Sequence, residues 1–199
     1  QRYLMHKQIY NHKTGKGIEY MICDILLKAN NKLKIAECIY KPEEFINLTD
    51  DILNTIKISK DPELQESQKI INRLEKRDLY KFIDEFIVPN ELTDKIKKIN
   101  PIDIISSNSE LNNLITINDI IIFDKKMNYN LNDKNPVDNV YFYNVKNKHY
   151  KYKKNKENIS LLLPDVFEER IIRLYSKINN TNINNLLKKA FNNYIKIYK

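Results

Sequence analysis

The spacing of apolar residues predicts a long helix at the start of the chain. Apolar residues that recur at steps of three and four form one stripe along a helix, and such a stripe packs against the rest of a fold. The positions that fit this stripe are Leu4, Ile18, Met21, Ile22, Ile25, Leu26 and Ala29. We therefore expect residues 2–29 to be helical, loosened at Gly15-Lys16-Gly17, with Cys23 on the buried face as a structural thiol.

Two further helices are predicted before residue 77. Leu48-Thr49 followed by Ile52, Leu53 and Ile56 indicates a capped helix. Asp61-Pro62 is a clear helix start, because a carboxylate can cap the first N–H groups and proline suits the first turn. This helix is expected to reach about Lys76. The pattern of residues 33–40 fits a strand and a helix equally well.

The remaining pattern changes from helical to mixed. Residues 79–87 could form a strand, and Pro89 and Pro101 bracket a short polar helix that is the best candidate for a boundary between two halves. Strands are predicted at 115–117, 119–124, 140–145 and 149–153. Helical spacing returns around 166–175 and again at 186–198. Helices followed by a mixed unit give an α+β fold, with regions 1–90 and 91–199.

Composition adds a basic charge to this picture without choosing a ligand. The 34 Lys and Arg exceed the 26 Asp and Glu, which gives a formal charge of +8. Such a surplus attracts anions of several classes, and a biased genome rich in Asn, Ile and Lys codons explains it equally well. No apolar run is long enough to span a bilayer, and Cys23 and Cys38 are too few for a disulfide framework. We expect an intracellular protein of the nucleus or cytoplasm, with no membrane partner.

The first predicted helix has residues suited to a nucleotide. Arg2, His6 and Tyr10 follow one another at steps of four, so they stay within about 80° of one another around a helix. Arginine grips phosphate oxygens in a fork, and tyrosine offers a flat wall to a sugar. A solvated basic helix face is the alternative.

Four ordered motifs resemble one family. They are similar to blocks of the sterile-alpha-motif-and-HD-domain dNTP triphosphohydrolases. The four motifs are residues 6–13 with 18–24, Arg77-Asp78-Leu79-Tyr80-Lys81, Asn135-Pro136-Val137-Asp138, and Leu162-Leu163-Pro164 through Tyr175. In that family the corresponding blocks are a signature helix, Arg-Asn-Leu-Phe-Lys, Asn-Pro-Ile-Asp and a last conserved helix. The four motifs of this chain follow the same order. The resemblance covers about residues 2 to 177. It implies the end of an HD core in 1–90 and a regulatory and oligomerisation lobe in 91–199.

The resemblance assigns roles to single residues. It implies that Arg2 grips the substrate triphosphate, that His6 and Tyr10 line the pocket, and that Asn11 stands where the family has Gln. It implies that regulatory nucleotides contact His12, Lys13, Arg77, Leu79 and Lys81. A Cys-Lys pair of the family is absent at Asn144-Val145, where Lys146 could substitute only after a shift of one residue.

The resemblance also implies partners and a metal ion. The partners are dNTP and GTP, with a homotetramer formed when nucleotides fill shared sites. An HD hydrolase holds a divalent metal (Mg, Mn, Fe or Zn) with two His and two Asp, and this chain has three His and no His-Asp pair. Without metal ligands, no catalytic residue is expected in this chain, and we expect it to bind no cofactor and to hydrolyse nothing by itself.

Two other functions stay open. Six lysines lie between Lys146 and Lys156 around His149, Tyr150 and Tyr152, a pattern that suits single-stranded nucleic acid but also a solvated edge strand. A purely structural oligomerisation module is the remaining alternative.

Overall fold

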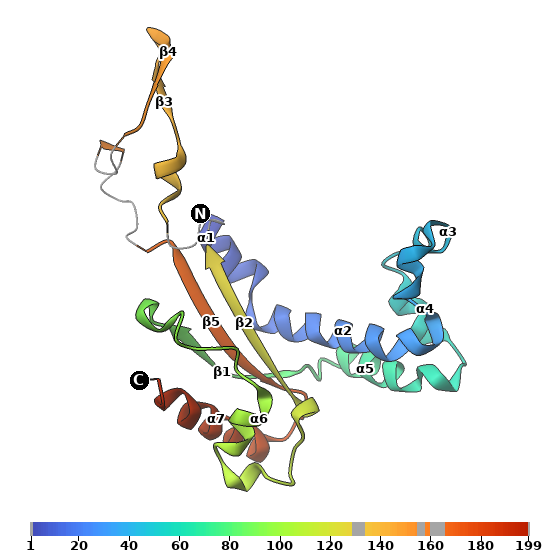
Figure 1. Ribbon diagram of the computed structural model, residues 1–199. Helices are drawn as coiled ribbons and strands as arrows, with labels where there is room; N and C mark the ends of the chain where they lie inside the picture. Colours follow the sequence, from blue (N-terminus) through green and yellow to red (C-terminus); the bar gives the residue numbers. More distant parts are fainter. Residues whose placement is uncertain (1, 129–133, 155–157, 160–165, 199) are drawn as a thin grey trace.

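The computed structural model describes residues 2–128, 134–154, 158–159 and 166–198 and has an α+β architecture (Figure 1). Its helices are α1 (Arg2–Met5), a π-helix (His6–Tyr10), α2 (Lys13–Leu33), α3 (Pro42–Phe45), α4 (Ile52–Ile58), α5 (Gln65–Glu75), α6 (Pro101–Ser106) and α7 (Thr181–Lys196). Its strands are β1 (Lys81–Val88), β2 (Ile120–Asn128), β3 (Phe142–Asn144), β4 (Asn147–Tyr152) and β5 (Glu168–Ser176). The expected α+β class is confirmed.

A three-stranded antiparallel sheet organises the second half of the chain. Its order is β1-β5-β2, so β5 is the central strand. Side chains of a strand alternate between the two faces. Ile172 and Leu174 of β5 point to the side of α6 and α7, whereas Arg173 and Tyr175 point to the side where the chain begins.

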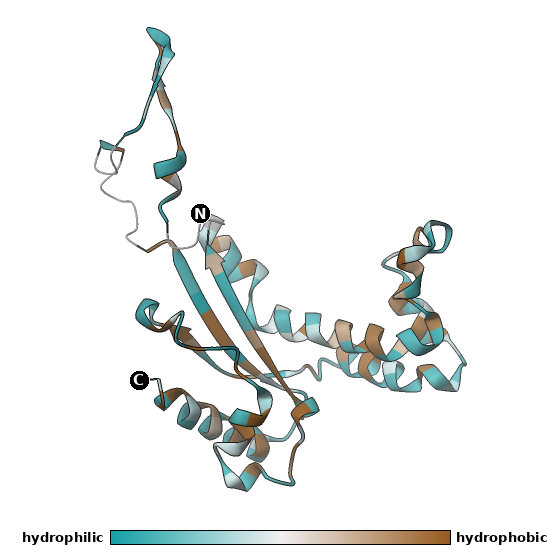
Figure 2. Cartoon of the chain, viewed as in Figure 1, coloured by the Kyte–Doolittle hydropathy of each residue, from teal (hydrophilic) through white to brown (hydrophobic). Residues whose placement is uncertain are grey.

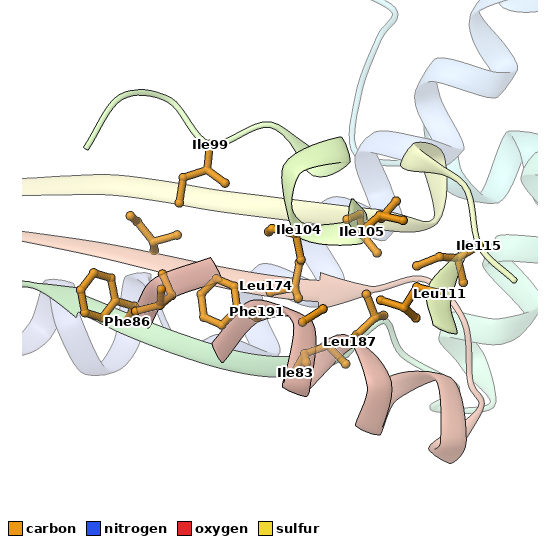
Figure 3. Close-up of a cluster of buried hydrophobic side chains, with 14 of the residues drawn as sticks. Ile83, Phe86, Ile99, Ile104, Ile105, Leu111, Ile115, Leu174, Leu187 and Phe191 are labelled. Atoms are coloured by element: carbon orange, nitrogen blue, oxygen red, sulfur yellow. The ribbon is translucent and has the colours of Figure 1, made fainter. Parts of the chain in front are cut away.

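Two apolar cores result from this arrangement. The larger one lies between the sheet and α6 and α7, where Leu174, Leu187 and Phe191 meet (Figure 3). The second lies between α2, α4 and α5, and its members Met21, Ile25 and Ile56 are fully buried. Figure 2 shows the apolar sides of these helices turned inward and the β3–β4 hairpin largely hydrophilic.

Several predicted elements are confirmed. The helix that begins at Asp61-Pro62 forms, with Asp61 accepting a hydrogen bond from the Glu63 N–H at 2.9 Å, and it continues to Glu75. α4, β1, β3, β4 and α7 also lie where the pattern indicated them. The stretch that fitted both strand and helix ends α2 and then forms a 3-10 turn at Glu37–Tyr40.

The prediction of a helix at 166–175 was wrong, because β5 occupies Glu168–Ser176. The buried Arg170 and Arg173 separate the apolar residues of this strand, so Ile171, Leu174 and Tyr175 fall at the three-and-four spacing of a helix face. The segment 90–100 forms only a 3-10 turn at Asn90–Leu92, not a polar helix. Residues 115–117 are not a strand either, since β2 starts at Ile120 after the 3-10 turn Ile117–Asp119.

The first helix also differs from the prediction. It is interrupted at Asn11 and His12 and not at Gly15-Lys16-Gly17, and α2 then continues to Leu33. Gly17 is needed for close packing: a Cβ there would lie 3.2 Å from the Tyr80 carbonyl oxygen. Cys23 is exposed, so the expected buried thiol is not there, whereas Cys38 is buried. The cap of α4 also differs, because Asp51 and not Thr49 is its N-cap residue.

Candidate nucleotide-binding surface

Glu169 of β5 anchors the start of the chain to the sheet. Its Oε2 accepts hydrogen bonds from the Tyr3 hydroxyl at 2.8 Å and from the Lys7 Nζ at 2.9 Å. Lys7 and Tyr3 are also hydrogen-bonded to each other. The other side of this short helical segment therefore stays free to face solvent.

His6 and Tyr10 lie on that exposed side. Their ring centroids are 5.2 Å apart, and 61% of the Tyr10 surface is accessible. The π-helix gives each turn more residues than an α-helix, yet the two rings are still neighbours. The structure thus brings His6 and Tyr10 together; Arg2 lies in α1, and its side chain is outside what the structure describes.

Asn11 forms the corner between the π-helix and α2, and it is buried. Its Nδ2 donates to the His6 carbonyl oxygen at 2.9 Å, and its own carbonyl oxygen accepts a hydrogen bond from Arg173 of β5. The amide therefore faces the chain's own backbone and not the exposed side where Tyr10 lies. Next to it, His12 caps α2 by accepting a hydrogen bond from the Thr14 N–H at 3.3 Å.

Lys13 lies against the beginning of β1. Its Nζ is 4.9 Å from the centre of the Phe82 ring, and its carbonyl oxygen accepts a hydrogen bond from the Tyr175 hydroxyl at 3.1 Å. Burial raises the pKa of Tyr175, so this phenol stays a donor at neutral pH. Phe82 follows Lys81 in β1. Lys13 and Lys81, which both belong to the predicted motifs, therefore lie at the same end of this strand.

Arg77 adopts a backbone conformation that is rare for its residue type. Its φ is 60°, and it follows the C-cap Lys76 of α5. The Arg77 N–H donates to Leu74 and the Asp78 N–H donates to Arg73, which together form a Schellman motif. Glycine is usual at this position, because a side chain costs about 1–2 kcal/mol in the left-handed region. Within the described ranges, no hydrogen bond or ion pair involves the exposed Arg77 side chain.

Asp78 gathers three polar side chains at the same turn. It accepts hydrogen bonds from Arg73 Nε at 2.9 Å and from Asn179 Nδ2 at 2.8 Å, and its Oδ1 is 3.8 Å from Lys81 Nζ. Arg73 also donates to the Lys177 carbonyl oxygen at 2.9 Å. The turn between α5 and β1 is therefore tied to the segment that follows β5.

Leu79 and Tyr80 hold the turn on its inner side. Leu79 is half-buried at the edge of the helical core, and the Tyr80 hydroxyl donates to Asp24 Oδ2 at 2.7 Å. Burial raises the pKa of Tyr80, and the hydrogen bond to Asp24 raises it further, so the phenol stays protonated. The same carboxylate is 2.5 Å from Lys177 Nζ.

Lys146 lies apart from the other candidate residues. It is exposed in the turn between β3 and β4, where its N–H donates to Asn144 Oδ1 at 3.0 Å. In Figure 1 this hairpin projects away from the sheet. Within this chain, Lys146 does not join Lys13, Arg77 and Lys81.

The described residues offer no ready metal site. No cluster of three or more His, Cys, Asp or Glu that could hold an ion occurs among them. His6 forms a ring pair with Tyr10, and His12 uses Nδ1 for the α2 cap. The described residues therefore do not fit the divalent ion of an HD site. None of the helices in the described ranges combines the length and apolar character of a membrane span.

Sequence reasoning missed the residues that shape this surface. Arg73 and Phe82 also position the candidate residues, whereas Asp78, Arg173 and Tyr175 were noted only as parts of motifs. Arg73 and Asp78 are the two ends of the Schellman motif, a spacing of five that could have been read once the helix end was known. Contacts with β5 could not be read, because that segment was predicted to be a helix.

Fold and surface together describe an α+β chain with exposed cationic and aromatic side chains near its start and at the turn between α5 and β1. The family model for the HD associated region matches residues 1–124, and the chain belongs to this family. This confirms the family expected from the motifs.

Curated relatives agree with that membership. The chain is 41% identical over 176 residues to the deoxynucleoside triphosphate triphosphohydrolase SAMHD1 homolog of Dictyostelium discoideum, covering 88% of this chain and 34% of that protein. It is 34% identical over 193 residues to deoxynucleoside triphosphate triphosphohydrolase SAMHD1 of Bos taurus (88% and 32%) and 31% identical over 189 residues to that of Homo sapiens (87% and 30%). The chain spans about a third of the length of these relatives.

Proposed function

We propose that this chain is the C-terminal part of a metal-dependent dNTP triphosphohydrolase, which cleaves a dNTP into a deoxynucleoside and triphosphate. Relatives named for this activity match 87–88% of the chain. In this proposal the chain contributes phosphate and regulatory contacts, while the metal ligands belong to other parts of the whole protein. Its first region, 1–90, completes an HD core, and 91–199 is a regulatory and oligomerisation lobe.

The substrate side of the proposal uses Arg2, His6, Tyr10 and Asn11. The paired, exposed rings of His6 and Tyr10 support it, because they offer an apolar wall beside a polar nitrogen. Asn11 acts in this proposal by ending the π-helix and thereby fixing the direction of Tyr10.

The regulatory side uses His12, Lys13, Arg77, Leu79 and Lys81, with Lys146 on the separate hairpin. The left-handed conformation of Arg77 is the observation on which this side depends most. A strained position where glycine would be easier indicates that its side chain has a task. An exposed guanidinium, with Lys81 four residues further on, suits the phosphates of GTP.

Binding of GTP to the 199-residue chain tests the regulatory side. We expect isothermal titration calorimetry to detect binding that weakens at least about fivefold in Arg77→Ala and in Lys81→Ala, as for loss of one charge-assisted contact. Lys69→Ala is the matched control, since this exposed lysine forms an ion pair with Glu66 on the same helix. Equal affinities for all four proteins would contradict the proposed site.

Hydrolysis by the chain alone tests where the metal chemistry resides. Incubated with dATP, GTP and Mg²⁺ or Mn²⁺, the chain is expected to release no inorganic triphosphate, because none of its described residues forms a metal site. Release above a no-protein control would show that the chain itself contains a catalytic centre.

A second candidate function is binding of single-stranded nucleic acid by the β3–β4 hairpin. Lys151 and Lys153 lie 4.7 and 5.4 Å from the Tyr141 ring centre, and every residue of β4 is exposed. Cations interleaved with rings suit phosphates and stacked bases. Salt-sensitive binding of an oligonucleotide, lost in the Lys148, Lys151 and Lys153 triple alanine variant but kept in Arg77→Ala, would favour it.

A further inference from the structure

The turn between α5 and β1 contains one acidic side chain in a strongly basic setting. Arg73, Lys76, Arg77 and Lys81 supply positive charge within nine residues, and Asp78 lies between the last two. The only other nearby acid in this stretch, Glu75, is paired at 2.6 Å with Lys57. Asp78 is therefore the carboxylate that an anion bound by Arg77 and Lys81 would face.

The contacts of Asp78 give it two opposing effects. Its hydrogen bonds from Arg73 and Asn179 hold the Schellman turn and so present Arg77 to solvent. At the same time its Oδ1 is 3.8 Å from Lys81 Nζ and attracts the ammonium group that phosphate would need. Asp78 is about one-third exposed, so its charge is not fully screened by water.

We propose that Asp78 is an affinity-setting residue: it orders the 77–81 turn through its hydrogen bonds, while its negative charge weakens the hold of that turn on a nucleoside triphosphate. This inference rests on the proposed regulatory nucleotide site. It separates the geometry of Asp78, which favours binding, from its charge, which opposes binding.

Asparagine separates these two properties at position 78. Its carbonyl oxygen can still accept the hydrogen bond of Arg73 Nε. Asn179 can turn its amide by 180° and accept a hydrogen bond from the new NH₂ group. The charge is lost while the shape and the hydrogen bonds are kept, so the turn is expected to stay in place.

The test measures GTP binding to the 199-residue chain and to its Asp78→Asn variant. We expect binding to tighten roughly three- to tenfold in low salt, because a negative charge several ångströms from the phosphates has been removed. The gain should shrink at 0.5 M salt, where screening is stronger. A role limited to holding the turn would give equal or weaker binding.

Two controls make the outcome decisive. Glu66→Gln removes one negative charge at the far end of the same helix and is expected to leave the affinity unchanged. Asp78→Ser, whose hydroxyl can still accept from Arg73, replaces the asparagine variant if thermal unfolding shows that the latter is not folded. Binding that depends on Arg77 but is equal or weaker in the neutral Asp78 variant overturns this inference alone. No GTP binding by any of the proteins overturns the regulatory site itself.

Discussion

Arg77 shows how backbone strain and side-chain chemistry oppose each other at one residue. Its left-handed conformation is stable because the Schellman hydrogen bonds and the Arg73–Asp78 pair surround it. The motif predicted Arg77 as a binding residue, but no pattern in the sequence predicted its φ. Glycine marks such positions, and here the marker is absent. Asn11 illustrates the same limit, since its burial became evident only with the hydrogen bond that Arg173, on a distant strand, donates to its backbone carbonyl oxygen.

Replacing Arg77 by glycine should stabilise the chain and weaken nucleotide binding. Relief of the left-handed strain, about 1–2 kcal/mol, exceeds the entropy that glycine adds to the unfolded chain, about 0.4–1 kcal/mol. We therefore expect the free energy of unfolding in urea to rise by roughly 0.5–1 kcal/mol, while GTP affinity falls as in Arg77→Ala.

Lys34 is the matched control for this substitution. It has a φ of 53° at the C-cap of α2 and lies outside the proposed site. Lys34→Gly should raise stability by a similar amount and leave GTP affinity unchanged. If Arg77→Gly binds GTP like the original chain, the strain at Arg77 has no functional meaning.

At the scale of elements, β5 is where the sequence prediction failed and where the fold is held together. Most residues of this strand are buried, because helices cover both sides of the sheet. The buried Arg170 and Arg173 interrupt the alternation of apolar and polar residues, so the spacing in the sequence favoured a helix over a strand. Elements with one exposed face, such as α5 and α7, were predicted well because their apolar stripe is visible in the sequence.

Shortening a buried side chain in the central strand should lower the stability of the fold more than shortening its neighbour in β2. Leu174→Ala, at a fully buried position, is expected to lower the free energy of unfolding by about 2–5 kcal/mol. Ile122→Ala is the comparison, because Ile122 of β2 pairs with Leu174 but is only partly buried. If urea denaturation shows that both variants lose the same free energy of unfolding, β5 is not more important to the fold than β2.

The 3-10 turn Pro62–Leu64, which precedes α5, gives a prediction about pH. Asp61 accepts a hydrogen bond from Lys32 and one from the Glu63 N–H, and these hold its pKa below the ordinary carboxyl value. A lowered pKa stabilises the fold above the ordinary value, and this stabilisation is lost as pH falls through the folded pKa. Asp61→Asn, which keeps a capping oxygen, should unfold at lower urea than the original chain at pH 7. This difference in stability between the variant and the original chain should disappear below about pH 4.

Asp51→Asn is the control for this pH effect. Asp51 is the N-cap residue of α4, but its side chain makes no capping hydrogen bond. We expect no pH-dependent gap between this variant and the original chain. If Asp61→Asn is less stable than the original chain by the same amount from pH 7 to pH 3, the ion pair with Lys32 does not contribute to stability.

On the scale of the whole molecule, the two cores meet at the sheet, where β2 contributes Ile120 to the sheet core and Ile121 to the helical core. The first part of α2 lies against the sheet, where Tyr20 contacts Tyr175, and its later part packs in the helical core through Met21 and Ile25. Asp24 joins Tyr80 and Lys177 across the same boundary. The sequence predicted two regions divided near residues 89–101, and this division stays a prediction. β1, which precedes it, pairs with β5, which follows it.

This continuity predicts that the chain unfolds as one unit. Ile25→Ala in the helical core and Leu187→Ala in the sheet core remove fully buried side chains, and each should cost about 2–5 kcal/mol. Because β2 contributes Ile120 to the sheet core and Ile121 to the helical core, each variant should shift the whole urea transition, with circular dichroism and tyrosine fluorescence changing together. Two separate transitions, one moved by each variant, would instead show that the regions fold independently, and the predicted boundary would then be a true domain boundary.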